Sequence, residues 1–80
     1  MTEKIEILRE YIRSEIGYQG DIDPDVDLLE ERVLDSYSIV QIAVFIQQRF
    51  EVELDAEDLV RANLCKLSAM VAMVERKLAA

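Results

Sequence analysis

The pair Asp35-Ser36 combines residue types and a position that can do chemistry. Asp is a favoured helix N-cap, and the apolar spacing of the following segment predicts a helix with Ser36 in its first turn. A hydroxyl there is accessible, and an attached anion would lie beside unpaired backbone N–H groups at the positive end of the helix dipole. An isolated Asp-Ser pair more often only caps a helix. The rest of the sequence must therefore distinguish capping from chemistry.

Two other groups of residues invite a functional interpretation. The alternating acids from Asp21 to Asp27 look like the start of a calcium loop, but such a loop needs Gly where Val26 stands and Glu where Arg32 stands. We expect a solvated acidic loop there. Cys65 has neither a second Cys nor a His beside it in the sequence, which favours a buried packing residue.

Composition excludes several classes of protein. The chain has no His, which removes an essential member of Ser-His-Asp and Cys-His catalysis and of most zinc sites, so we do not expect an enzyme. With 17 acidic and 9 basic residues, its net charge of −8 disfavours nucleic-acid binding. The charge favours partners with basic surfaces, although it also simply keeps a small protein soluble.

Length and apolar content predict a single domain over residues 1–80. The lone Cys indicates a reducing compartment, and neither a signal-peptide core nor a membrane-spanning apolar run is present in the sequence. We expect a cytoplasmic monomer that does not bind membranes.

Apolar spacing predicts a first helix over about residues 3–16, capped by Thr2 and stopped by Gly17. A long loop follows over residues 18–34, because Gly, Pro and Asp interrupt the periodicity. A loop of this length needs apolar anchors, and the candidates are Ile22, Val26, Leu28, Leu29, Val33 and Leu34.

The second helix, residues 36–50, has a core-facing stripe and a further apolar face. The stripe comprises Ile39, Ile42, Ala43, Ile46 and Phe50. The further face has Tyr37, Val40 and Val44 at helical spacing, and it either meets a partner or packs under the long loop.

Two more helices complete an all-α chain. Asp55 begins a short helix over about residues 56–61, with Asp58 three residues after this cap. The last helix covers about residues 67–78, with Glu75 and its basic neighbours facing water. Its core stripe is predicted to be Leu67, Val71, Val74 and Leu78.

The whole chain resembles the acyl and peptidyl (aminoacyl) carrier proteins. Four segments carry the resemblance: LLEERVLDS around Ser36, IQQRFEVEL after the second helix, DAEDL into the third, and NLCKLSAMVAMVERKL in the fourth. The resemblance implies a bundle of three main helices plus one short helix, with a long loop between helices one and two.

The resemblance also implies that Ser36 receives 4′-phosphopantetheine from coenzyme A, through a separate phosphopantetheinyl transferase that uses Mg²⁺. Asp35 matches the family residue that helps hold the coenzyme and the metal. The arm then carries cargo as a thioester, which implies a loading ligase or adenylating enzyme and downstream synthases, transferases or tailoring enzymes as partners.

Two departures from the family pattern concern the pathway. Tyr37 stands where the family usually has Leu, Ile or Met, and Arg49 is the single charge in a helix that is strongly acidic in fatty-acid carriers. A specialised nonribosomal peptide, polyketide or related pathway therefore fits better than housekeeping fatty-acid synthesis. The expected partner contacts are Tyr37, Val40, Gln41 and Val44. An unmodified helical adaptor that binds through this helix is the alternative of another class.

Overall fold

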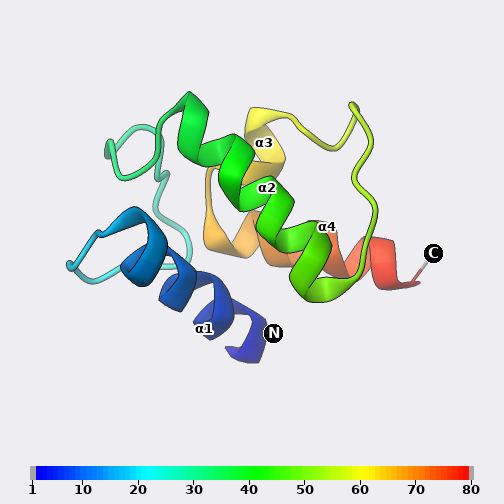
Figure 1. Ribbon diagram of the computed structural model, residues 1–80, viewed down its shortest axis with the longest axis horizontal. Helices are drawn as coiled ribbons and strands as arrows, with labels where there is room; N and C mark the ends of the chain where they lie inside the picture. The colour runs from blue at the N-terminus through cyan, green and yellow to red at the C-terminus, as the bar shows by residue number, and fades with distance from the viewer. Residues whose placement is uncertain (1, 80) are drawn as a thin grey trace.

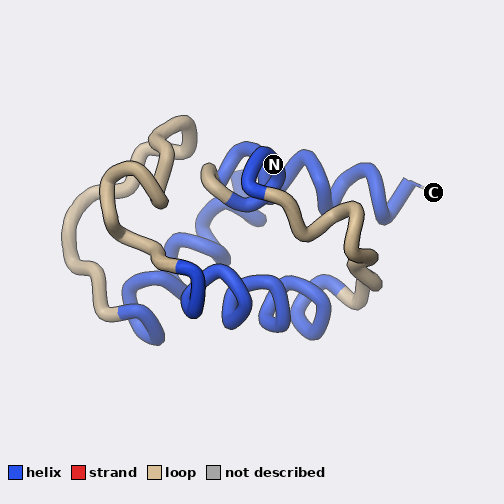
Figure 2. Tube along the Cα trace, turned by 90° about the horizontal axis from the view of Figure 1, so that it is seen from above, coloured by secondary structure: helices blue, strands red, loops and turns tan. Residues whose placement is uncertain are grey.

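The computed structural model describes residues 2–79 as helices joined by loops, with no strand among them. The elements are α1 (Thr2–Tyr11), a π-helical turn η1 (Ile12–Ile16), α2 (Ser36–Phe50), α3 (Arg61–Leu64) and α4 (Leu67–Ala79). Figure 1 shows the three long helices with the single-turn α3 beside them, and Figure 2 shows the two long connections at opposite ends of the molecule. The expected all-α architecture is confirmed.

The helices share one apolar core. Ile42, Ala43 and Ile46 of α2 are buried as predicted, while Ile39 and Phe50 pack against the core from its margin. The buried core residues contributed by the other elements are Leu8, Ile12, Ile22, Leu28, Leu34, Leu54, Leu64, Cys65, Leu67, Met70, Val71, Met73 and Val74. Removal of this apolar surface from water is the main source of stability in so small a chain.

The first helix differs from its prediction at its start and in the form of its last turn. It begins at Thr2, so Thr2 lies in the helix and does not precede it as a cap. Its last turn widens into η1, where the Gly17 amide donates to the Ile12 carbonyl at 2.9 Å. Gly17 has φ +89°, a left-handed conformation that Gly adopts without steric cost, and it ends the helix as predicted.

The loop over residues 18–35 is held in place by its apolar side chains and by polar contacts to other elements. Ile22, Leu28 and Leu34 are buried, and the other three predicted anchors, Val26, Leu29 and Val33, pack against the core. The Arg9 guanidinium of α1 donates twice to the Ile22 carbonyl, at 3.0 and 3.2 Å. The Leu28 amide donates to the Cys65 carbonyl at 2.6 Å, which ties the loop to the segment before α4.

The predicted short helix is wrongly placed. Asp55 and Asp58 close a turn, in which the Asp55 amide donates to the Asp58 carboxylate at 2.8 Å and the Asp58 amide donates to the Asp55 carbonyl at 2.9 Å. This turn does not continue as a helix, since Val60 is extended (φ −119°, ψ 155°) and α3 starts only at Arg61. Lys77 of α4 holds the Asp58 carboxylate at 2.6 Å, a tertiary contact that fixes the turn.

The last helix has the predicted position but a different buried face. Leu67, Val71 and Val74 are buried, whereas Leu78 is 52% exposed and does not belong to the core stripe. Met70 and Met73, which the predicted stripe omitted, are fully buried. Lys77, expected to face water, is half-buried against Asp58.

Candidate functional site

The start of α2 places Ser36 at the first helical position, on the exposed surface. Asp35 precedes it in extended conformation, and its Oδ1 accepts a hydrogen bond from the Ser38 amide at 2.8 Å. The predicted N-cap is therefore confirmed in its geometry. The cap fixes the direction of the first turn, and so the place of the Ser36 hydroxyl at the end of the helix.

The same turn favours negative charge. The N–H groups of the first turn have no helical acceptor, and they lie at the positive end of the α2 dipole. The hydrogen bond from the Ser38 amide, with a smaller contribution from the Ser38 hydroxyl, lowers the pKa of Asp35 below its ordinary value. Asp35 is thus a carboxylate at neutral pH.

The other carboxylates of the described residues do not form a metal site. Within residues 2–79, no three His, Cys, Asp or Glu side chains are grouped to hold an ion. In the acidic loop, Asp23 accepts from the Asp25 amide, and Asp27 accepts from the amides of Leu29 and Glu30. Asp27 also binds Arg61 at 2.9 Å, so these carboxylates shape the loop.

The further apolar face of α2 is open to solvent. Tyr37 is 71%, Val40 61% and Val44 46% exposed, whereas Gln41 is half-buried. The alternative, in which this face packs under the long loop, is wrong. Val40 and Val44 also line a groove of about 200 Å³ whose other wall includes Leu59 and Leu64.

Ser36 lies on the side of α2 that forms this groove. Val40, Ala43 and Gln47 follow Ser36 at spacings of four, seven and eleven residues, which places the four residues on one stripe of the helix. Val40, Ala43 and Gln47 line the groove. Sequence reasoning missed the opposite wall, although the apolar pair Leu59 and Val60, both exposed, marks its position in the sequence.

Comparison with protein families identifies the kind of site. The family model of the phosphopantetheine attachment site matches residues 6–74. The chain belongs to this family. A comparison with curated proteins found no match.

Phosphopantetheine attachment domains are carriers to which 4′-phosphopantetheine is bound covalently, and the chain is therefore a phosphopantetheine-bearing carrier protein. The residues at the start of α2 fit this group, because an exposed hydroxyl stands beside amides that favour an anion. When bound, the arm would supply a terminal thiol. Carriers of this family present cargo and are generally not catalysts themselves. Of the helices in residues 2–79, none is long and apolar enough to cross a membrane.

Proposed function

We propose that Ser36 is the residue that receives 4′-phosphopantetheine. The supporting observation is its place: it is exposed, it opens α2, and it follows a capping Asp. The other serines of the chain are less suited. Ser14 donates its hydroxyl to the Glu10 carbonyl, and Ser38 and Ser68 are half-buried.

Asp35 has one observed role and one proposed role. Its carboxylate caps α2, and during modification it helps to hold coenzyme A and Mg²⁺ in the complex with a phosphopantetheinyl transferase. Its lowered pKa supports the second role, since a carboxylate that stays ionised attracts the divalent ion that accompanies the diphosphate of coenzyme A.

The exposed face formed by Tyr37, Val40, Gln41 and Val44 is the proposed partner-binding face. Large apolar side chains that are exposed beside a reacting position mark an interaction site more often than a solvated surface. The groove next to this face extends along the Ser36 side of α2, where the apolar part of the arm or its cargo can lie.

The pathway is proposed from the charge of α2. Its only charged residue is Arg49, in the last turn, so a partner would meet an apolar and amide-rich surface. This supports a dedicated carrier for an acyl or aminoacyl group, loaded by an adenylating ligase, in nonribosomal peptide, polyketide or related biosynthesis. A housekeeping fatty-acid carrier is the second candidate within the family. Membership of the family favours a carrier over an unmodified adaptor.

The proposed domain comprises residues 1–80, and the proposed form is a cytoplasmic monomer. Modification is tested by incubating the apo protein with coenzyme A and a broad-specificity phosphopantetheinyl transferase and measuring intact mass. Gain of one phosphopantetheine by the wild type and by Ser38→Ala, with no gain by Ser36→Ala, is the expected result. Equal modification of Ser36→Ala would place the arm on another residue.

A further inference from the structure

A second groove lies on the other side of α2 from Ser36. It has a volume of about 440 Å³, larger than the groove beside Ser36, and it lies where α1 and η1 meet α2. The residues that line it are Ile7, Glu10, Tyr11, Ser14, Glu15 and Phe45. Phe45 follows Ser36 by nine residues, which is two and a half helical turns, so the two side chains leave opposite sides of α2.

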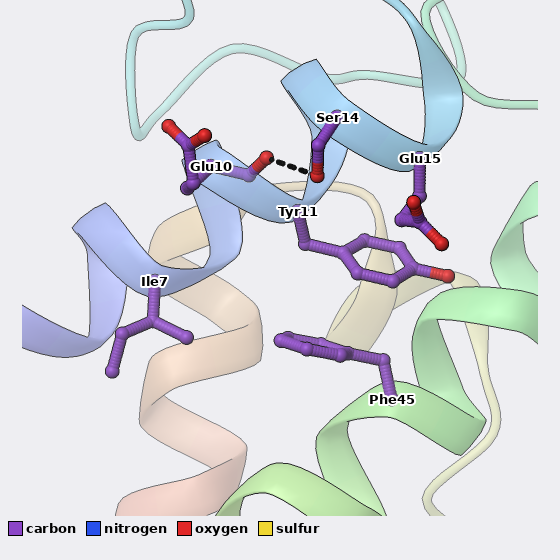
Figure 3. Close-up of a pocket in the computed structure, with 6 residues that line it drawn as sticks. All are labelled: Ile7, Glu10, Tyr11, Ser14, Glu15 and Phe45. Carbon is purple, nitrogen blue, oxygen red and sulfur yellow. Dashed lines mark hydrogen bonds between the residues drawn. The ribbon is translucent and has the colours of Figure 1, made fainter.

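An aromatic pair forms the apolar part of this groove. The rings of Tyr11 and Phe45 are stacked, with centroids 4.2 Å apart and planes inclined by 27°. Figure 3 shows the two rings facing one another, with Ile7 nearby on α1. Because both aromatic residues are only half-buried, part of this apolar surface stays open to a ligand.

Two exposed carboxylates border the aromatic pair. Figure 3 shows Glu10 and Glu15 on opposite sides of Tyr11. Glu10 has one basic neighbour, Arg13, at 4.0 Å, and an exposed pair at that distance neutralises little charge. Burial and then the charge of Glu15 raise the pKa of Tyr11, so Tyr11 remains a neutral aromatic surface. The hydroxyl of Ser14 donates a hydrogen bond to the Glu10 carbonyl.

We propose that this groove, formed by Ile7, Glu10, Tyr11, Ser14, Glu15 and Phe45, docks a basic segment of a protein partner, with an arginine side chain against the Tyr11 and Phe45 rings and basic side chains of the segment paired with Glu10 and Glu15. Arginine fits both features, because its planar guanidinium stacks on aromatic rings and its charge pairs with carboxylates. The net charge of −8 also favours a basic partner at encounter.

The inference goes beyond the proposed function and does not depend on modification of Ser36. A partner held at this groove leaves Ser36 free on the other side of α2, whereas Tyr37 and Gln41 lie between the groove and Ser36 around the helix. The chain would then have two adjoining contact surfaces, one beside Ser36 and one around Tyr11 and Phe45.

The test is an NMR titration of the full apo chain with the blocked peptide acetyl-Leu-Arg-Arg-Leu-amide. Saturable shift changes are expected in residues 7–15 and at Phe45. The variant Glu10→Gln/Glu15→Gln should bind about fivefold more weakly, the loss expected for two exposed charge pairs. The matched variant Glu53→Gln/Glu57→Gln, with the same net charge, should bind as the wild type does.

Four results would overturn the proposal. The first is the absence of saturable shifts in the groove, and the second is equal weakening by both double variants, which indicates general charge attraction only. The third is equal affinity for a peptide with citrulline in place of arginine, since citrulline is neutral. The fourth is a shift of the groove residues on dilution without peptide, which would identify a self-association surface. The wild-type shift map gives an answer even if a variant does not fold.

Discussion

The Oδ1 atom of Asp35 lies 2.8 Å from the backbone nitrogen of Ser38 and thereby fixes the turn that presents Ser36. One carboxylate thus serves the helix and, in the proposed function, the modification reaction. The two roles respond differently to substitution, because Asn also caps helices well but carries no charge.

Asp35→Asn should keep the fold and lose modification rate. We expect its thermal midpoint to stay near that of the wild type, while transfer of phosphopantetheine slows about tenfold or more, the usual effect of disturbing the groups that support a metal site. Asp35→Ala should lower both the thermal midpoint and the rate of phosphopantetheine transfer. Thermal unfolding and the time course of intact mass measure the two roles separately, and an unchanged rate for Asp35→Asn would leave Asp35 as a cap alone.

Stability should fall in acid. Lys77, together with the Asp55 amide, lowers the pKa of Asp58, and backbone amides lower the pKa values of Asp27 and Asp35. A carboxylate whose pKa is lower in the folded state stabilises the fold above its unfolded pKa, near 3.8, and this contribution is lost as pH falls from there through the folded value.

The acid effect is checked by urea unfolding at several pH values. Asp58→Asn should lose stability at neutral pH and show a shallower decrease below pH 3.8 than the wild type. Asp21→Asn removes an equal charge from the exposed loop and serves as the control. Parallel acid curves for the wild type and Asp58→Asn would contradict a contribution from Asp58.

Stability should also fall in strong alkali. Asp58 raises the pKa of Lys77, so the stabilisation from this pair persists below pH 10.5 and is lost as pH rises through the folded value.

Tyr37→Asp should weaken partner binding and leave the fold intact. Tyr37 is 71% exposed, so its replacement is expected to change stability by less than about 0.5 kcal/mol. A charge on the proposed partner face should raise the KM of the phosphopantetheinyl transferase by about fivefold, the effect of losing an interface contact. Arg49→Gln, which changes the net charge by the same amount at an exposed position of α2 outside this face, is the matched control. An equal rise in KM for both variants would show that the transferase does not bind specifically through this face.

Leu67 and Leu78 should respond very differently to truncation. Leu67 is fully buried, so Leu67→Ala should lower the free energy of unfolding by about 2 to 5 kcal/mol. Leu78 is exposed, and Leu78→Ala should change it by less than about 0.5 kcal/mol. Chemical unfolding measures both. Similar losses at the two positions would show that Leu78 is covered in solution.

The sequence predicted the elements whose determinants are local. Asp35 is a cap followed by fifteen residues with helical spacing, and α2 begins and ends where this pattern does. The anchors of the long loop were also identified, because six apolar side chains in an otherwise polar segment leave water only by packing against the core.

Features that depend on tertiary contacts could not be predicted. Asp55 and Asp58 have the spacing of a helix start, but Lys77, nineteen residues after Asp58, holds them in an isolated turn. The exposure of Leu78 and the burial of Met73 depend on which sides of α4 the rest of the fold covers. The stacking of Tyr11 on Phe45 joins two helices and is not encoded in the periodicity of either.

The central claim is that Ser36 carries the arm, and peptide mapping of the modified wild-type protein tests it most directly. Trypsin separates the serines, because cleavage after Arg13, Arg32, Arg49 and Lys66 puts Ser14, the pair Ser36 and Ser38, and Ser68 on different peptides. We predict phosphopantetheine on the peptide of residues 33–49, with fragmentation assigning it to Ser36. The arm on Ser38 or on a peptide with Ser14 or Ser68 would contradict the account.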